Sequence, residues 1–383
     1  MKHVFIDIRF SLSLSATYAK FNGGNNYTIR VIRLLDSMRE CSTHLLCEVG
    51  AVENARNLFP GIDIRGIDSL GELRLNDGDV LFSPHVDDSK SYAHELEELK
   101  FNNPKCKICL TVHDRRHLEL GSDKYDGLLR EGIKVPSAAL ALKRRVGGVS
   151  VDKALKRIIA LADKIFTVSN YSMQAILRMN QNIDIKYYTQ RIGDDITAKA
   201  DRADGDILFV SAGRREKNFV RALIAFEKYV EASGSDIRLI ATGLSDRQKE
   251  RIIKSDIVRK ETIDNHLEMR GYIDNAELDQ LYDSCRFLLY PSRNEGYGLP
   301  VAEAMLHGMP SVASRVSSIP EVTGSAAVYV SPTSEDSIYR GISLMMDDDY
   351  YEKMLEYVLA RRRIMIEQIK LDERIFVNDL LFG

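Results

Sequence analysis

The sequence predicts an α/β protein of two Rossmann-like domains, each a parallel sheet covered by helices. Short apolar runs alternate with segments of helical periodicity along the whole chain, which is typical of such sheets. The 383 residues also exceed what one hydrophobic core usually organises. We therefore expect two parallel sheets that face each other across a cleft, with ligands at the carboxyl ends of the strands.

Ten apolar runs are the expected strands. In the first half of the chain they cover residues 4–8, 44–49, 79–83, 108–112 and 164–168, and in the second half residues 206–211, 237–241, 267–271, 286–290 and 310–314. Residues that can cap a helix mark three expected starts, at Asn25, Ser169 and Asp274. The charged stretch 194–206 is the expected linker, which gives domains at 1–193 and 194–349. A helical tail, 350–383, can pack back on the first domain.

Composition excludes several classes of function. The chain has 53 Lys and Arg against 56 Asp and Glu, a net charge of −3, so it lacks the broad basic surface that nucleic-acid binding requires. No apolar run approaches the roughly 20 residues that span a bilayer, and the first ten residues resemble a core strand, which favours a cytoplasmic location. Cys106 and Cys109 form a CxxC, but no second pair follows at zinc-ligand spacing, so we expect structural thiols and no metal site.

The segment 286–314 carries the clearest chemical signal. A loop with Glu295, Gly296 and Gly298 lies between an expected strand and a helix start at Pro300. Glycine lets the backbone approach a ligand, and the free amides of a helix start favour an anion. The loop therefore suits a diphosphate.

Two glutamates flank this loop, because Glu303 follows Glu295 by eight residues and is expected in the first turn of the helix. A carboxylate can accept hydrogen bonds from both hydroxyls of a diol, so each could hold one sugar of a nucleotide-linked donor. Alternatively, Glu303 only complements the helix dipole and Glu295 is a solvated loop acid. The neighbouring glycines and proline favour the first interpretation.

At these residues the chain resembles a known family. The block EGYGLPVAE, from Glu295 through Glu303, looks like the paired-glutamate signature of family 4 retaining glycosyltransferases of the GT-B fold, and residues 317–332 continue as that family does. LFSPH (81–85) and LTVHD (110–114) resemble its mannosyltransferase-like branch, which builds bacterial surface polysaccharides. The resemblance implies an acceptor-side first domain and a donor-binding second domain.

The resemblance also implies roles for single residues. The glutamate at the position of Glu295 contacts the donor sugar, and the one at Glu303 holds the ribose. Four intervening amides bind phosphate oxygens, those of Gly296, Tyr297, Gly298 and Leu299. The turn 271–285 resembles the base-binding turn, where main-chain groups of Tyr272 and Ile273 meet the nucleobase. Guanine and uracil both stay open.

A second loop, within 208–223, is rich in cations that can neutralise a departing nucleoside diphosphate. Lys217 matches the family's lysine in its Arg-Lys-Asn triplet, but Glu216 stands at the arginine position. Arg214 and Arg215 are the candidates for the second cation. The alternative is a solvated charged loop.

The first half offers two further candidate sites. Gly23 and Gly24 precede an expected helix and can approach a pyrophosphate, and the resemblance implies a glycine loop at the catalytic cleft. His113 and Asp114 follow an expected strand, and the family's histidine-aspartate pair lies close to the transferred sugar. Two weaker candidates for a contact to the sugar are His85 and His117.

The locally basic region 143–157 can attract anionic lipid headgroups or a lipid-diphosphate acceptor, which would bring the protein to the inner face of the membrane. The alternative is a solvated helix face.

We therefore expect a retaining, metal-independent hexosyltransferase, with His113, Asp114, Lys217 and Glu295 in catalysis. Its donor is a GDP- or UDP-linked sugar, mannose or similar, its acceptor is a glycan or lipid-linked saccharide, and it needs no further cofactor. The alternatives are a sugar-nucleotide epimerase or a phosphorylase on the same scaffold, or a non-catalytic sugar-nucleotide-binding subunit.

Overall fold

The computed structural model describes residues 2–10, 23–38, 40–114, 119–121, 123–129, 152–189, 198 and 205–383. The chain divides into two compact units. Unit 1 comprises Met1–Leu118, Val135–Arg191 and Gln368–Gly383, and unit 2 comprises Glu119–Lys134 and Ile192–Glu367. Residues 119–134, which the expected boundary after residue 193 assigned to the first domain, thus cluster with unit 2. The expected linker lies outside the described residues except for 198, 205 and 206.

Unit 1 is built on a parallel sheet whose described strands follow the order β3-β2-β1-β4-β5-β6-β7. They are β1 (Lys2–Asp7), β2 (Cys41–Cys47), β3 (Asp63–Gly66), β4 (Val80–Ser83), β5 (Lys107–Val112), β6 (Lys164–Thr167) and β7 (Ile185–Tyr187). In register, Ile6 of β1 lies between Leu45 of β2 and Phe82 of β4. The five strands expected in this half are confirmed, and β3 and β7 are additional.

Helices of unit 1 connect these strands. They include α1 (Gly23–Asp36), α2 (Val52–Leu58), α3 (Lys90–Asn102) and α7 (Asn170–Leu177), with the 3-10 turns η2 (Val49–Ala51) and η3 (Leu70–Glu72), and residues 152–161 are also helical. Ser169 is confirmed as a helix cap, because its side chain accepts a hydrogen bond from the amide of Ser172. The expected start at Asn25 is wrong: α1 already begins at Gly23, and Asn25 is buried within it.

Unit 2 is built on a second parallel sheet, of order β10-β9-β8-β11-β12-β13. Its strands are β8 (Ile207–Phe209), β9 (Leu239–Ala241), β10 (Leu267–Met269), β11 (Phe287–Tyr290), β12 (Ser311–Ser314) and β13 (Ala327–Val330). β9 and β10, which follow β8 in the chain, lie on one side of it, whereas β12 and β13, which follow β11, lie beyond β11 on the other side. The strand order therefore reverses between β8 and β11. The five strands expected here are confirmed, and β13 is additional.

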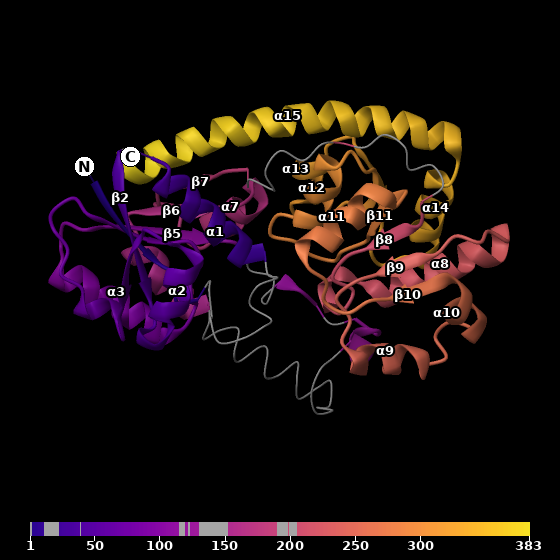
Figure 1. The fold of residues 1–383 in the computed structure, drawn as a ribbon, viewed down its shortest axis with the longest axis horizontal. Coiled ribbons are helices and arrows are strands. Elements are labelled where there is room, and N and C mark those ends of the chain that lie inside the picture. The colour runs from indigo at the N-terminus through magenta and orange to yellow at the C-terminus, as the bar shows by residue number, and fades with distance from the viewer. Residues whose placement is uncertain are drawn as a thin grey trace. The chain divides into compact units, whose positions relative to one another are not determined.

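Nine described helical elements of unit 2 precede the long last helix, and most are drawn in salmon to orange in Figure 1. They are α5 (Asp126–Leu129), η4 (Arg215–Lys217), α8 (Phe219–Ser233), α9 (Asp246–Ile253), α10 (Lys260–His266), α11 (Asn275–Ser284), α12 (Leu299–Leu306), α13 (Ile319–Thr323) and α14 (Glu335–Met345). Fully buried Phe209, Phe219 and Phe287 form part of its core, to which Leu129 of α5 also belongs. Asp274 is confirmed as the cap of α11, because its carboxylate accepts from the amide of Glu277.

The last helix, α15 (Asp348–Leu381), is the long yellow helix of Figure 1. Its final turns pack in unit 1, where Leu380 and Leu381 are fully buried. Lysines of the neighbouring strands surround this end: Lys107 Nζ donates to the carbonyl oxygen of Asp379 at 3.1 Å, and Lys186 Nζ lies 2.7 Å from its carboxylate. Cations are favourable at a helix C-terminus because the helix dipole is negative there.

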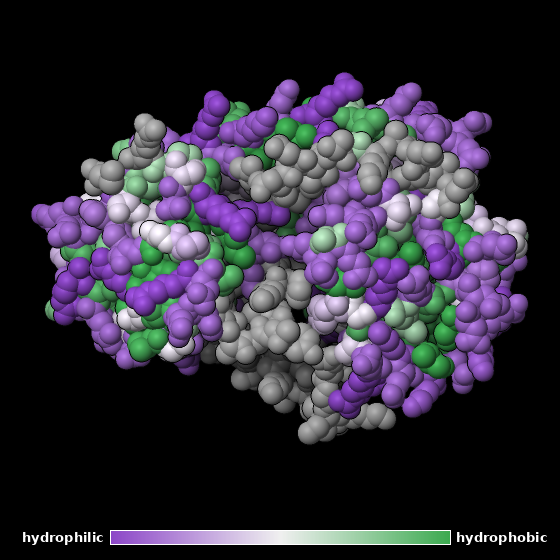
Figure 2. Space-filling view, viewed as in Figure 1, coloured by the Kyte–Doolittle hydropathy of each residue, from purple (hydrophilic) through white to green (hydrophobic). Residues whose placement is uncertain are grey.

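The face shown in Figure 2 is mostly hydrophilic, with hydrophobic residues in small groups between charged ones. Within the part of the chain that the structure describes, no helix combines the length and the apolar character needed to cross a bilayer.

Candidate functional site

The candidate site of unit 2 lies where the strand order reverses. Open α/β sheets bind ligands beyond the carboxyl ends of the strands at such a point, because the connections there run to opposite sides. The loop after β8 leads into η4 and α8, and the loop after β11 leads into α12. Since β8 and β11 are paired neighbours, the loops that carry Lys217 and Glu295 meet at one edge of the sheet.

A buried polar cluster joins these two loops. Lys217 Nζ lies 2.6 Å from Glu295 Oε1, and the two side chains are 5% and 4% exposed. The hydroxyls of Tyr290 and Ser292 each donate to the same oxygen, at 2.6 Å. Lys217 also donates to the hydroxyl of Tyr290. A buried charge is tolerated only when it is paired and hydrogen-bonded, so the cluster fixes both side chains. Sequence reasoning named Lys217 and Glu295 but not Tyr290 or Ser292.

The glycine loop after Glu295 adopts a conformation that requires glycine. Gly298 caps α12 with φ of 97°, and a Cβ built there would lie 3.2 Å from Val301 Cγ2. Ser318 holds the loop from behind, because its hydroxyl donates to the carbonyl oxygens of Glu295 and Tyr297. These contacts support the loop that carries Gly296 and Tyr297 and leads into α12 at Leu299.

The expected place of Glu303 in the first helical turn is wrong. α12 begins at Leu299, so Glu303 is its fifth residue and its first turn contains no acidic residue. The position weakens the interpretation that Glu303 only complements the helix dipole, since that effect falls off within the first turn. Instead, Glu303 Oε2 accepts a hydrogen bond from the buried hydroxyl of Tyr282, at 2.9 Å.

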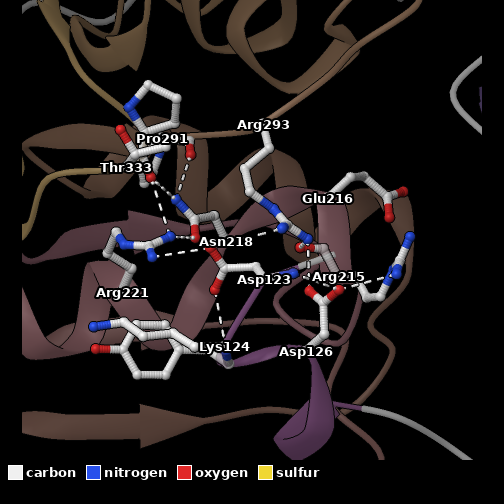
Figure 3. A network of polar contacts seen from close by, with 12 residues as sticks. Asp123, Lys124, Asp126, Arg215, Glu216, Asn218, Arg221, Pro291, Arg293 and Thr333 are labelled. Atoms are coloured by element: carbon white, nitrogen blue, oxygen red, sulfur yellow. Dashed lines mark hydrogen bonds and ion pairs between the residues drawn. The ribbon is translucent and has the colours of Figure 1, made fainter. Parts of the chain in front are cut away.

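Beside the loop after β8 lies a network of arginines and aspartates, shown in Figure 3. Asp126 Oδ2 lies 2.9 Å from Arg215 Nη1, and Asp126 Oδ1 lies 2.6 Å from Arg293 Nη2. Asp123 pairs with Arg221 at 2.9 Å. The two aspartates thus neutralise arginines of both loops and of α8. No local pattern predicts this, because Asp126 and Arg293 stand 167 positions apart.

Arg214 and Arg215, the two candidates for the second cation, differ in their contacts. The Arg215 guanidinium is held by Asp126. The side chain of Arg214, at the N-cap of η4, forms no hydrogen bond or ion pair with any described residue. The backbone amide of Arg293 donates to the carbonyl oxygen of Glu216, the residue at the family's arginine position, at 2.7 Å.

The expected base-binding residues follow β10 at the same edge of the sheet. Tyr272 is 53% exposed, and Ile273 is half-buried. Their loop is tied to the loop after β9, because the amide of Gly243 donates to the carbonyl oxygen of Gly271 at 2.8 Å. This hydrogen bond joins the two loops immediately before Tyr272.

In unit 1 the structure brings His113 and His85 together, with ring centroids 5.1 Å apart. A ring nitrogen of His113 contacts the carbonyl oxygen of Pro84 at 2.9 Å, and the Tyr27 ring meets His113 edge-on. Asp114 is half-buried next to it. Tyr27 belongs to α1, whose first residues are Gly23 and Gly24. Thus α1 and the ends of β4 and β5 meet at His113. His117 lies outside the described residues.

The remaining predictions concern the cysteines and the basic region. Burial raises the pKa of the Cys106 thiol to about 11 and that of Cys109 to about 12, so both stay protonated at neutral pH. Residues 143–151 of the basic region lie outside the described residues. Of its other part, Arg157 pairs with Glu97 at 2.6 Å and Lys156 with Asp152 at 3.2 Å.

Comparison with known proteins supports the predicted family. Residues 196–362 match the model of glycosyl transferases group 1. O-antigen chain mannosyltransferase B of Escherichia coli is 28% identical over 218 residues, 53% of this chain and 57% of that protein. Serotype-specific mannosyltransferase WbdA of Escherichia coli is 31% identical over 98 residues, 25% of this chain and 12% of WbdA. The chain thus spans about half of the first relative's length and a smaller part of the second's.

The fold is also found in solved structures. HepE from Anabaena, solved in complex with UDP and glucose, matches with a TM-score of 0.68 at 13% identity, and the match covers 100% of both chains. This confirms the expected fold class, an α/β protein of the GT-B type with two parallel sheets. Residues 196–362, which contain the paired glutamates, therefore resemble the group 1, or family 4, glycosyl transferases in sequence, and the whole chain shares the GT-B fold.

Proposed function

We propose that the chain transfers a hexose, mannose or a similar sugar, from a GDP- or UDP-linked donor to a glycan or lipid-linked saccharide acceptor. The observation that carries the proposal is the buried Lys217–Glu295 pair, which joins two loops where the strand order reverses. A cation and a carboxylate beside a glycine-bearing helix start offer partners for a phosphate and for a sugar hydroxyl. The similarity to O-antigen mannosyltransferases supports mannose as the sugar.

The proposed transfer retains the anomeric configuration and uses no metal ion or other cofactor. The bond between the anomeric carbon and the phosphate oxygen breaks, and its electron pair leaves with the diphosphate. The acceptor hydroxyl oxygen forms the new bond on the same face of the sugar, and its proton passes to the departing phosphate oxygen. Lys217 and the amides of 296–299 stabilise the charge that develops on the leaving group.

The remaining site residues take the roles that the family resemblance implies. Glu295 holds the donor sugar, Glu303 the ribose, and the main chain at Tyr272 and Ile273 the base. For His113 and Asp114 of unit 1, the resemblance implies a part in catalysis. Contact with the inner face of the membrane through region 143–157 stays a prediction.

The test uses the full chain with GDP-mannose, UDP-glucose and UDP-N-acetylglucosamine, each with and without a short α-mannoside acceptor. Release of the nucleoside diphosphate that depends on the acceptor and persists in EDTA supports the proposal. The product should show by NMR the anomeric configuration of the donor. Glu303→Gln should weaken donor binding. The matched control is Asp336→Asn, which breaks an exposed ion pair with Lys228 on the surface of unit 2.

Other outcomes would favour the alternatives. Donor binding without transfer or hydrolysis would contradict the proposal and indicate a sugar-nucleotide-binding subunit. Conversion of the donor to its epimer without acceptor would indicate an epimerase.

A further inference from the structure

We infer that Tyr282 is a positioning residue that fixes the carboxylate of Glu303 for the diol of a ribose. The inference rests on the proposed function, in which Glu303 holds the ribose of the donor nucleotide. The inference adds that a residue of the neighbouring helix α11 holds the Glu303 side chain. Neither the sequence motif nor the comparisons assign a role to this helix residue.

One hydrogen bond between two helices holds the carboxylate of Glu303. Tyr282 lies on α11 and Glu303 on α12, and the phenol hydroxyl donates to Glu303 Oε2 at 2.9 Å. The Tyr282 side chain is fully buried, with 1% of its surface exposed. Burial raises the pKa of Tyr282 well above its usual value, and the charge of Glu303 raises it further. The phenol therefore stays protonated and remains a donor to the carboxylate at any physiological pH.

The Tyr282 ring is in turn held by His307. The two rings stack with centroids 5.2 Å apart and an angle of 25° between their planes. His307 Nδ1 lies 2.8 Å from Asp283 Oδ1, and Nε2 lies 3.3 Å from Asp279 Oδ1.

The helical spacing makes this arrangement possible. Glu303 lies on α12, and His307, four residues later, is the C-cap of that helix on the same face, while Asp279 and Asp283 stand four apart on the facing side of α11. Tyr282 lies between the two faces. The helices therefore lock together at the residue that orients Glu303.

This contact has a consequence for the ligand. A carboxylate offers about four lone-pair sites, so one bond from Tyr282 is compatible with two from a vicinal diol. A glutamate side chain that is already ordered loses less conformational entropy when the ligand binds. Tyr282 should therefore strengthen the contact to the ribose hydroxyls and leave contacts elsewhere on the nucleotide unchanged.

The test measures recognition of the ribose hydroxyl by calorimetric titration of the full chain. The probes are GDP and UDP, each with its 2′-deoxy counterpart, and three variants are compared: Glu303→Gln, Tyr282→Phe and Tyr329→Phe. Tyr329→Phe is the control, because it removes another phenol hydroxyl of unit 2, which bonds to Thr323 Oγ1 at 2.8 Å.

For the unaltered chain we expect a preference for the ribose form of roughly tenfold or more, as for a hydrogen bond to a charged group. Glu303→Gln should remove most of it. Tyr282→Phe should reduce it by at least about threefold, with less than about a twofold change in affinity for the 2′-deoxy form. Tyr329→Phe should leave the preference unchanged.

The outcomes separate the inference from the function on which it rests. If Glu303→Gln removes the preference and Tyr282→Phe keeps it, the inference is wrong and the proposed function stands. If Tyr282→Phe weakens ribose and deoxyribose forms equally, Tyr282 is merely structural and the inference is again wrong. If the chain binds neither nucleotide, or if Glu303→Gln keeps the preference, the proposed role of Glu303 fails and the inference with it.

Discussion

Asp126 is the residue whose replacement tests the charge network most directly. Its carboxylate bridges Arg215 and Arg293, which come from the two loops of the candidate site (Figure 3). Asp126→Asn keeps the shape of the side chain but removes the charge. Two guanidinium groups would then share a neutral amide in place of a carboxylate.

The expected cost follows from burial. The side chain of Asp126 is 7% exposed, that of Arg293 9% and that of Arg215 20%. Removing one partner of a buried ion pair costs about 3–5 kcal/mol. Because Arg215 is partly solvated and Arg293 keeps a hydrogen bond to the carbonyl oxygen of Arg215, we expect the lower end, about 3 kcal/mol.

The assay is thermal unfolding followed by circular dichroism. In domains of about 150–250 residues, 1 kcal/mol shifts the Tm by about 2–4 °C, so Asp126→Asn should lower the Tm of unit 2 by roughly 6–12 °C. Added salt should change this difference little, because buried pairs are weakly screened. Asp336→Asn, which breaks an exposed pair, should leave the Tm unchanged.

A double-mutant cycle checks that the loss arises from this contact. Asp126→Asn combined with Arg293→Gln should cost less than the sum of the two single changes, because both remove the same ion pair. The reasoning is refuted if Asp126→Asn shifts the Tm no more than Asp336→Asn does, or if the two costs simply add.

Three further predictions concern the glycine loop, the catalytic cation and acid stability. Lys217→Ala should lower kcat by about 100-fold or more in steady-state kinetics, as does loss of an oxyanion donor, and an unchanged kcat would remove Lys217 from the mechanism. Gly298→Ala should cost at least about 1 kcal/mol of unfolding free energy because of its positive φ, whereas Gly127→Ala, on a helix with open space around it, should cost nothing. Burial raises the pKa of Asp123, but bonds from the Tyr125 amide and from Arg221 outweigh burial and hold it below its usual 3.8. The ionised Asp123 therefore stabilises the folded chain above pH 3.8, and this stabilisation is lost as the pH falls below that value. The Tm should fall more steeply with acid in the unaltered chain than in Asp123→Asn. Equal slopes in the two proteins would contradict this.

The strands were predictable because a strand buried on both faces of a parallel sheet reads as a continuous apolar run. Ile207–Phe209 and Phe287–Tyr290 show this, since every residue of both strands is buried. β3 and β7 lack the signal: in β3 only Ile64 is buried, and β7 has no buried residue. β13 does carry an apolar run, Ala327–Val330, although it is not among the ten expected strands. The start of α1 was misplaced because Asn25 has the type of a capping residue but lies inside the helix.

The residues of the candidate site also differ in whether the sequence alone predicts them. Glu295, Gly298 and Glu303 lie within one short segment, so their spacing and the need for glycine at a positive φ can be read from the chain. The partners of these residues cannot. Tyr282 reaches Glu303 from another helix, and Asp126 comes from a segment that clusters with unit 2 although its flanks belong to unit 1.

The amino-acid sequence by itself determined the alternation of strands and helices, the two-domain class and the phosphate-loop motif, because each depends on neighbouring residues and on local backbone geometry. Only the tertiary structure decided which of Arg214 and Arg215 pairs with an aspartate, what holds Glu303 and with which unit residues 119–134 cluster. Those outcomes depend on burial and on charges that meet across more than a hundred positions of sequence, as Asp126 and Arg293 do. Desolvation makes such contacts strong, and nothing in the local sequence encodes which charges will be desolvated together.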